Sequence, residues 1–102
     1  MQPVIEDNRE AISRLCRQHG VRRLEAFGSV LRDDFDPERS DVDVLVEFEP
    51  SVAKSFHNFL DLKESLERLL RRPVDLVEAH SIRNRRLRHH IESHKAPIYA
   101  AA

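Results

Sequence analysis

Two aspartates separated by one residue, Asp41 and Asp43, are the first candidates for chemistry in this chain. Side chains at positions i and i+2 of a strand point to the same face, so these two carboxylates should lie close together. Like charges at that spacing repel each other unless a cation neutralises them. Magnesium is usually bound by one or two carboxylates together with substrate phosphates. The pair therefore indicates a magnesium–phosphate site, although a solvated acidic segment leading into a strand has the same pattern.

A third acid, Asp75, interrupts the apolar run from Val74 to Val77. An ionised carboxylate on a buried strand costs free energy unless it has a partner. If this strand neighbours that of Asp43, the three acids can hold two metal ions about 4 Å apart, which clamps the attacking and leaving oxygens of a displacement. The alternative is an edge strand that leaves Asp75 in water.

The dipeptide Gly28-Ser29 follows a predicted strand. A glycine at a strand end lets the backbone approach a phosphate, and the amides of a helical turn beginning there present the positive end of a dipole. Ser29 can add a hydroxyl donor or cap that turn. Arg32 can contact phosphate, or it can be a solvated arginine on the helix surface. For Gly-Ser taken alone, a tight turn with an ordinary serine cap is the simpler explanation.

The elements that must position these residues follow from hydrophobic periodicity. An apolar stripe of Ile12, Leu15 and Cys16 predicts a first helix that ends at Gly20. A second helix should bury one stripe and end before Pro73. The stripe predicted for it contains Phe56, Phe59, Leu60, Leu66, Leu69 and Leu70. A last, basic helix is expected from Ile82 to His94, and its Ile82, Leu87 and Ile91 could complete the core or dock a partner.

Three strands are predicted around these helices, and residues 33–40 form a polar loop that contains Pro37. The strands cover Val21 to Phe27, Val42 to Phe48 and Val74 to Glu78. The resulting order of helix, strand, turn, strand, helix, strand and helix predicts an α/β or α+β fold, with helices packed on a small mixed sheet.

Size and composition limit the classes of protein that need to be considered. The 102 residues predict one domain, residues 1–102, with 40% hydrophobic and 34% charged residues, as in a globular protein. The formal net charge of −1 gives no whole-molecule attraction to nucleic acid or to anionic membranes. No apolar run approaches the ~20 residues that a membrane span needs. A single cysteine, Cys16, excludes an internal disulfide and fits a buried thiol in the cytoplasm.

Taken together, the stretch FGSVLRDDFDPERSDVDVLVEFEP resembles the signature of the DNA-polymerase-β-like nucleotidyltransferase superfamily. RRPVDLVEA resembles the strand that carries its third carboxylate. The resemblance runs from about Val21 to Ile98 and is closest to the small stand-alone type, the minimal nucleotidyltransferases. One departure is an eleven-residue spacing from Val30 to Ser40, where the family usually has ten residues; the extra residue falls in the segment of residues 36–39.

The resemblance implies a polymerase-β-like fold and an activity. Gly28, Ser29 and Arg32 would bind the phosphates of ATP, and Asp41, Asp43 and Asp75 would be catalytic ligands of two Mg²⁺ ions, with Mn²⁺ as an alternative. The acceptor would be a tyrosine of a cognate HEPN-domain toxin encoded alongside, so that transfer of AMP makes this chain an antitoxin. Nucleotide choice, acceptor residue and oligomeric state are not readable from the sequence.

Two other functions remain open at this stage. The chain could neutralise its partner by complex formation without turnover. Alternatively, the basic segment with Arg83, Arg85, Arg86, Arg88 and Lys95 could bind nucleic acid. It lacks interleaved aromatic residues, which favours a solvated helix face instead. His90 and His94 have the i, i+4 spacing that suits zinc, but no third ligand is evident in the sequence.

Overall fold

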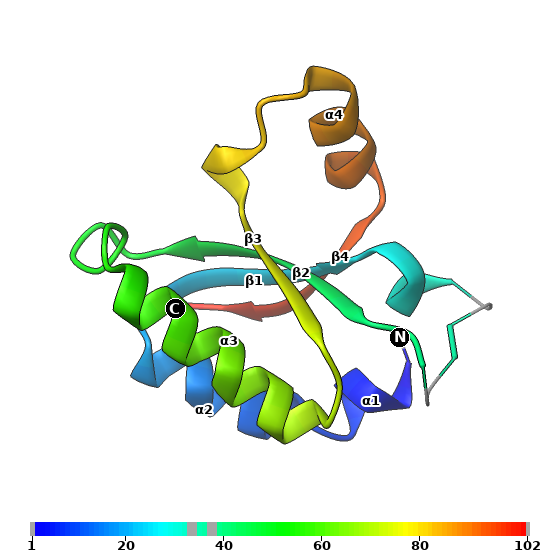
Figure 1. Ribbon diagram of the computed structural model, residues 1–102, viewed down its shortest axis with the longest axis horizontal. Helices are drawn as coiled ribbons and strands as arrows, with labels where there is room; N and C mark the ends of the chain where they lie inside the picture. The colour runs from blue at the N-terminus through cyan, green and yellow to red at the C-terminus, as the bar shows by residue number, and fades with distance from the viewer. Residues whose placement is uncertain (1, 33–34, 37–38, 102) are drawn as a thin grey trace.

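The computed structural model describes residues 2–32, 35–36 and 39–101, and it has a mixed α/β architecture (Figure 1). A four-stranded sheet separates two helical layers, with α2 and α3 on one face and α4 on the other (Figure 1). The elements are α1 (Pro3–Glu6), α2 (Arg9–Gln18), β1 (Val21–Phe27), the 3₁₀ turn η1 (Gly28–Leu31), β2 (Val42–Phe48), α3 (Phe56–Leu70), β3 (Val74–Glu78), the 3₁₀ turn η2 (Ala79–Ser81), α4 (Arg85–Ser93) and β4 (Lys95–Ala100).

The sheet has the strand order β3-β2-β1-β4, with β2 and β3 parallel and the other two pairs antiparallel. The predicted mixed sheet is confirmed, and the three predicted strands have the expected bounds. Parallel pairing of β2 and β3 is possible because α3 forms the crossover between them. In consequence the N-terminal ends of β2 and β3 lie side by side, next to the C-terminal end of β1.

The main core lies between the sheet and the helices α2 and α3. β2 contributes Val42, Val44 and Val46, each no more than 2% exposed, because alternate residues of a strand share a face. Cys16 is buried in the same core, as expected, and burial raises the pKa of its thiol to about 12. This thiol is a packing group rather than a nucleophile.

The stripe predicted for α3 was wrong at two positions. Phe56 is 73% exposed and Leu60 is 38% exposed, whereas Leu62 is completely buried. The buried residues Leu62, Leu66 and Leu70 repeat every four positions, which turns Phe56 and Leu60 away from the sheet. The helix ends at Arg71, which adopts the left-handed conformation with φ 56°, two residues before Pro73.

The C-terminal region differs most from the expectation. The last helix begins at Arg85, where Asn84 Oδ1 accepts a hydrogen bond from the Leu87 amide, and not at Ile82. A fourth strand, β4, occupies the segment expected to lead into the alanine tail. It was missed because it contains Pro97; a residue without an amide proton is tolerated here because β4 lies at the sheet edge.

Candidate active site

Asp43 and Asp75 are direct neighbours across the sheet. Their Cα atoms are partners in the parallel register of β2 and β3, so both side chains lie on the same face. Asp41 precedes β2 by one residue and is exposed, two positions before Asp43. The structure therefore brings the three predicted carboxylates together at the N-terminal ends of β2 and β3. Asp75 is exposed because β3 is an edge strand. The edge strand that was considered from sequence as an alternative to the metal site is therefore also present, and it does not separate Asp75 from the other two acids.

The acids lie on the face of the sheet that α4 covers. Leu45 and Val77 follow Asp43 and Asp75 at i+2, and Leu45 packs with Ile82 and Ile91 in a second small core. α4 thus stands over the same face as the carboxylates, while α2 and α3 fill the opposite face (Figure 1). Residues of α4 therefore contribute to the surface around the three acids and the Gly-Ser pair. The spacing of the acids in the sequence did not predict this contribution.

Two features require a glycine at position 28: the backbone conformation and the closeness of the Asp43 carboxylate. It has φ +75°, a conformation that residues with a side chain rarely adopt. A Cβ atom at this position would lie only 2.2 Å from Asp43 Oδ2. Glycine therefore allows the Asp43 carboxylate to contact the backbone where β1 ends and η1 begins.

Ser29 does not cap the following turn. It lies inside η1, whose N-cap position is Phe27, and no side chain caps that turn. Instead, Ser29 Oγ donates a long hydrogen bond of 3.5 Å to the carbonyl oxygen of Asp41. The prediction of a serine cap was wrong because the 3₁₀ turn starts one residue earlier, at Gly28 itself. The contact nevertheless joins the Gly-Ser pair to the acidic pair.

The electrostatic environment of Asp43 reflects this convergence. Burial raises the pKa of Asp43 most, and the negative charges of Asp75 and Asp41 raise that pKa further. The positive charge of Arg32 acts in the opposite direction. Asp41, Asp75 and Arg32 are therefore close enough to influence Asp43, as expected for a site that a cation or a charged ligand would stabilise.

A set of contacts positions the segment that leads to Asp41. Arg72 Nη1 donates to the Ser40 carbonyl oxygen at 3.5 Å, and the guanidinium lies 5.5 Å from the centre of the Phe35 ring. Ser40 Oγ in turn accepts a hydrogen bond from the Asp36 amide at 2.9 Å. These contacts connect the segment before β2 with the residues just before β3. The remainder of the loop expected to carry the extra residue, residues 37–38, lies outside the described part of the chain.

The metal-binding prediction is not tested by the arrangement of side chains. Within residues 2–32, 35–36 and 39–101, no group of three or more His, Cys, Asp or Glu residues is arranged to hold a metal ion by itself. Magnesium sites of the phosphoryl-transfer type complete their coordination with phosphates and water, so a closed protein cage is not expected. The oxygen donors at the N-terminal ends of β2 and β3 fit such a hard cation.

Comparison with known proteins decides the family. The family model described as a nucleotidyltransferase domain matches residues 9–98. This chain belongs to the nucleotidyltransferase-domain family. It is 44% identical over 72 residues to the protein adenylyltransferase MntA of Thermococcus cleftensis, a match that covers 69% of this chain and 68% of the relative.

Solved structures of nucleotidyltransferases share the fold. A structure described as a "putative minimal nucleotidyltransferase" superposes with a TM-score of 0.75 and 37% identity, covering 90% of both chains. A structure of a tri-AMPylated Shewanella oneidensis HEPN toxin in complex with an MNT antitoxin matches with a TM-score of 0.68 and 19% identity, covering 94% of this chain and 72% of the other. The expected polymerase-β-like nucleotidyltransferase fold is thus confirmed.

The basic residues of α4 lie on the surface of this nucleotidyltransferase. Arg85, Arg86 and Arg88 are exposed, as is His89. His90 and His94 stack with ring centres 4.5 Å apart, and no third metal ligand joins them among the described residues. The zinc site considered from their spacing therefore has no support. Nucleic-acid binding by α4 stays the less favoured alternative to a solvated helix face. No helix in the described part of the chain has the length and apolar character needed to cross a membrane.

Proposed function

We propose that this nucleotidyltransferase moves AMP from ATP to a hydroxyl group of a partner protein, a tyrosine of a HEPN-domain toxin, and so acts as its antitoxin. The observation that carries the proposal is the contact of Gly28 with Asp43 and the pairing of Asp43 with Asp75. It joins the phosphate-binding turn to the acids. The similarity to a protein adenylyltransferase, and to the antitoxin bound to an AMPylated HEPN toxin, supports the choice of donor and acceptor.

The residues have separate tasks in the proposed reaction. The backbone at Gly28 and the hydroxyl of Ser29 would hold the β- and γ-phosphates of ATP, with Arg32 as a further positive charge near Asp43. Asp41, Asp43 and Asp75 would hold two Mg²⁺ ions, or Mn²⁺ ions, which supply charge neutralisation and polarise the reacting oxygens when bound. The exposed position of Asp75 on the edge strand leaves space for a macromolecular acceptor beside it.

The chemical step is a displacement at the α-phosphorus. The tyrosine oxygen forms a bond to that phosphorus, the bond to the bridging oxygen breaks, and pyrophosphate leaves. Asp75 would favour loss of the hydroxyl proton from the acceptor, because it is the acid nearest the open edge of the sheet. Catalysis of this type depends on positioning and charge, so it needs no histidine or cysteine nucleophile.

The test uses the HEPN-domain protein encoded alongside as acceptor, with ATP and magnesium, and intact-mass spectrometry as the readout. We expect the acceptor to gain the mass of one or more AMP groups, and the variant with Asp41→Ala and Asp43→Ala to abolish that gain. If the acceptor is neutralised with unchanged mass, neutralisation by complex formation alone replaces this proposal. If the double variant still labels the acceptor, the assignment of the acids as metal ligands is wrong.

A cytoplasmic location belongs to the same proposal. ATP and a co-encoded partner are available there, and a single buried thiol fits a reducing compartment. Fractionation of cells that express the chain would test it.

A further inference from the structure

We propose that the pocket between η1 and α4 binds the adenine ring of the donor nucleotide, with the stacked pair His90 and His94 as its recognition surface. The inference rests on the proposed function and adds a base-binding site to it. The pocket has a volume of about 480 Å³ and includes Gly28 and Arg32 in its lining. That volume is within the range of small-molecule sites, about 300–1,000 Å³.

The position of the pocket follows from Gly28, which belongs to both the pocket and the acid site. On one side Gly28 lies against the Asp43 carboxylate, and on the other it lines the cavity under α4. A nucleotide whose phosphates lie at Gly28 and Asp43 therefore has this pocket beside it. The pocket is on the side of β1 and β4, whereas Asp75 is on the opposite edge strand β3. Donor and acceptor would thus approach from different sides.

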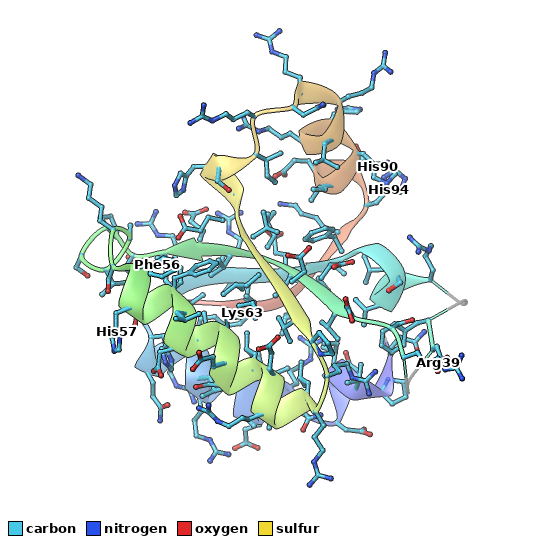
Figure 2. The ribbon with its side chains drawn as sticks, viewed as in Figure 1. Arg39, Phe56, His57, Lys63, His90 and His94 are labelled. Carbon is cyan, nitrogen blue, oxygen red and sulfur yellow. The ribbon has the colours of Figure 1, made fainter. Side chains whose placement is uncertain are left out.

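The chemistry of the walls suits a planar aromatic ring. Phe27, Leu31, Leu87 and Ile91 provide apolar surface. The rings of His90 and His94 lie at 25° to each other and are drawn side by side at the C-terminal end of α4 in Figure 2. Stacking on such a surface is the usual way in which proteins hold a base without reading its sequence context.

His94 also offers a polar contact that suits adenine. His94 Nδ1 lies 2.9 Å from the carbonyl oxygen of His90, and a carbonyl oxygen can only accept, so this nitrogen carries the proton. In the neutral ring the other nitrogen, Nε2, is then an acceptor. The exocyclic amino group of adenine is a matching donor.

Lys95 lines the pocket and is held in place by two acids. Its ammonium group is bound by Glu25 and Glu92, each at 2.9 Å, and only 18% of the side chain is exposed. Burial lowers the pKa of Lys95, but the hydrogen bonds that it donates to these two carboxylates, together with their negative charges, raise the pKa more, so the group stays charged. Because Lys95 is held by two acids, we assign it to the support of the pocket and not to phosphate binding.

The test compares two ligands that share phosphates and differ in the base. Calorimetry with Mg²⁺ measures the Kd of ATP and of inorganic tripolyphosphate for the wild type, for the variant with His90→Ala and His94→Ala, and for His89→Ala. His89 is an exposed histidine of the same helix that does not line the pocket. We expect the double variant to weaken ATP binding about tenfold and to leave tripolyphosphate binding unchanged. His89→Ala should change neither.

Several outcomes would overturn the inference. Unchanged ATP binding in the double variant, or equal weakening of both ligands, means that the pocket does not hold the base. A raised KM for the acceptor protein with an unchanged Kd for ATP means that an aromatic side chain of the acceptor occupies it. Leu87→Ser, at a wall residue that is 51% exposed, repeats the test if the histidine variant unfolds α4. Failure of the wild type to bind ATP would overturn the proposed function as well. ATP binding by the wild type that the histidine substitutions leave unchanged would overturn only the base-binding pocket.

Discussion

Gly28 lies so close to Asp43 that a Cβ atom on the glycine would be 2.2 Å from the carboxylate oxygen Oδ2. The phosphate-binding turn and the central acid of the site are therefore one packed unit. Their mutual position is fixed by the antiparallel register that pairs Phe27 with Asp43. The opposite neighbour of Asp43 in the sheet is Asp75, so a single residue connects both halves of the proposed site.

Gly28→Ala should lower the rate of nucleotidyl transfer at least about 100-fold, because the added methyl group displaces the Asp43 carboxylate and the backbone beside the phosphates. It should also lower stability by more than about 1 kcal/mol, because alanine is strained at φ +75°. Gly20→Ala is the matched control, since Gly20 has φ +68° and a Cβ atom there would lie 2.7 Å from Val52 Cγ2 instead of against a carboxylate of the site. It should cost stability and preserve the activity of the folded molecules. Equal activity loss in both variants would contradict the role given to Gly28.

Asp43→Asn should abolish transfer and at the same time stabilise the protein without metal at neutral pH. The pKa of Asp43 is raised by burial and by the charges of Asp75 and Asp41, so the folded protein binds its proton more tightly than the unfolded chain does. Wild-type stability should therefore fall as pH rises from the ordinary value of 3.8 through the raised pKa. The asparagine variant lacks this decrease.

Thermal unfolding at several pH values measures both effects for Asp43. The two proteins should have similar Tm values below pH 3.8, and the variant should have the higher Tm at pH 7. Addition of Mg²⁺ with ATP should raise the Tm of the wild type more than that of the variant, because the variant lacks a ligand. A variant that is less stable than the wild type at pH 7 would mean that Asp43 is satisfied by partners within the protein.

Much of this architecture could be predicted from sequence because each signal was local. The alternation along β2 fixed which face of the strand carries Asp43, and the residues around Asp75 have the same period. The pairing of these two strands needed the structure, because register depends on the crossover through α3. β4 was missed because Pro97 is unfavourable in most strands. The strand forms because β1 offers an unpaired edge to which β4 can add as an edge strand.

Asp61 and His19 join α3 to the end of α2, and we expect Asp61→Asn to reduce stability in a pH-dependent way. The His19 side chain is only 9% exposed; its Nε2 lies 2.8 Å from Asp61 Oδ2 and its Nδ1 lies 2.7 Å from the Leu15 carbonyl oxygen. The hydrogen bond from His19 lowers the pKa of Asp61. This contribution is complete above the ordinary value of 3.8 and is lost as pH falls through the lowered pKa.

Chemical unfolding of wild type and Asp61→Asn at pH 6 and at the lowest pH where both fold measures this effect. The difference in stability should be present at pH 6 and shrink as the carboxylate is protonated. Glu64→Gln removes an exposed carboxylate from the same helix and serves as the control. A stability difference that is independent of pH would mean that packing, and not the charge of Asp61, is responsible.

Arg72→Ala should raise the Mg²⁺ concentration needed for half-maximal activity, because Arg72 holds the segment before Asp41 through Ser40 and the Phe35 ring. We expect about a tenfold increase, in the range found for residues that orient metal ligands. The loss of stability should be small, about 1 kcal/mol, since a cation–π contact at a half-buried site contributes no more than that. Arg68→Ala is the control, because its guanidinium donates to Ser65 on the surface of the same helix, α3. Activity assays over a Mg²⁺ titration distinguish the two roles: a lower maximal rate with an unchanged Mg²⁺ midpoint would mean that Arg72 does not position the acids.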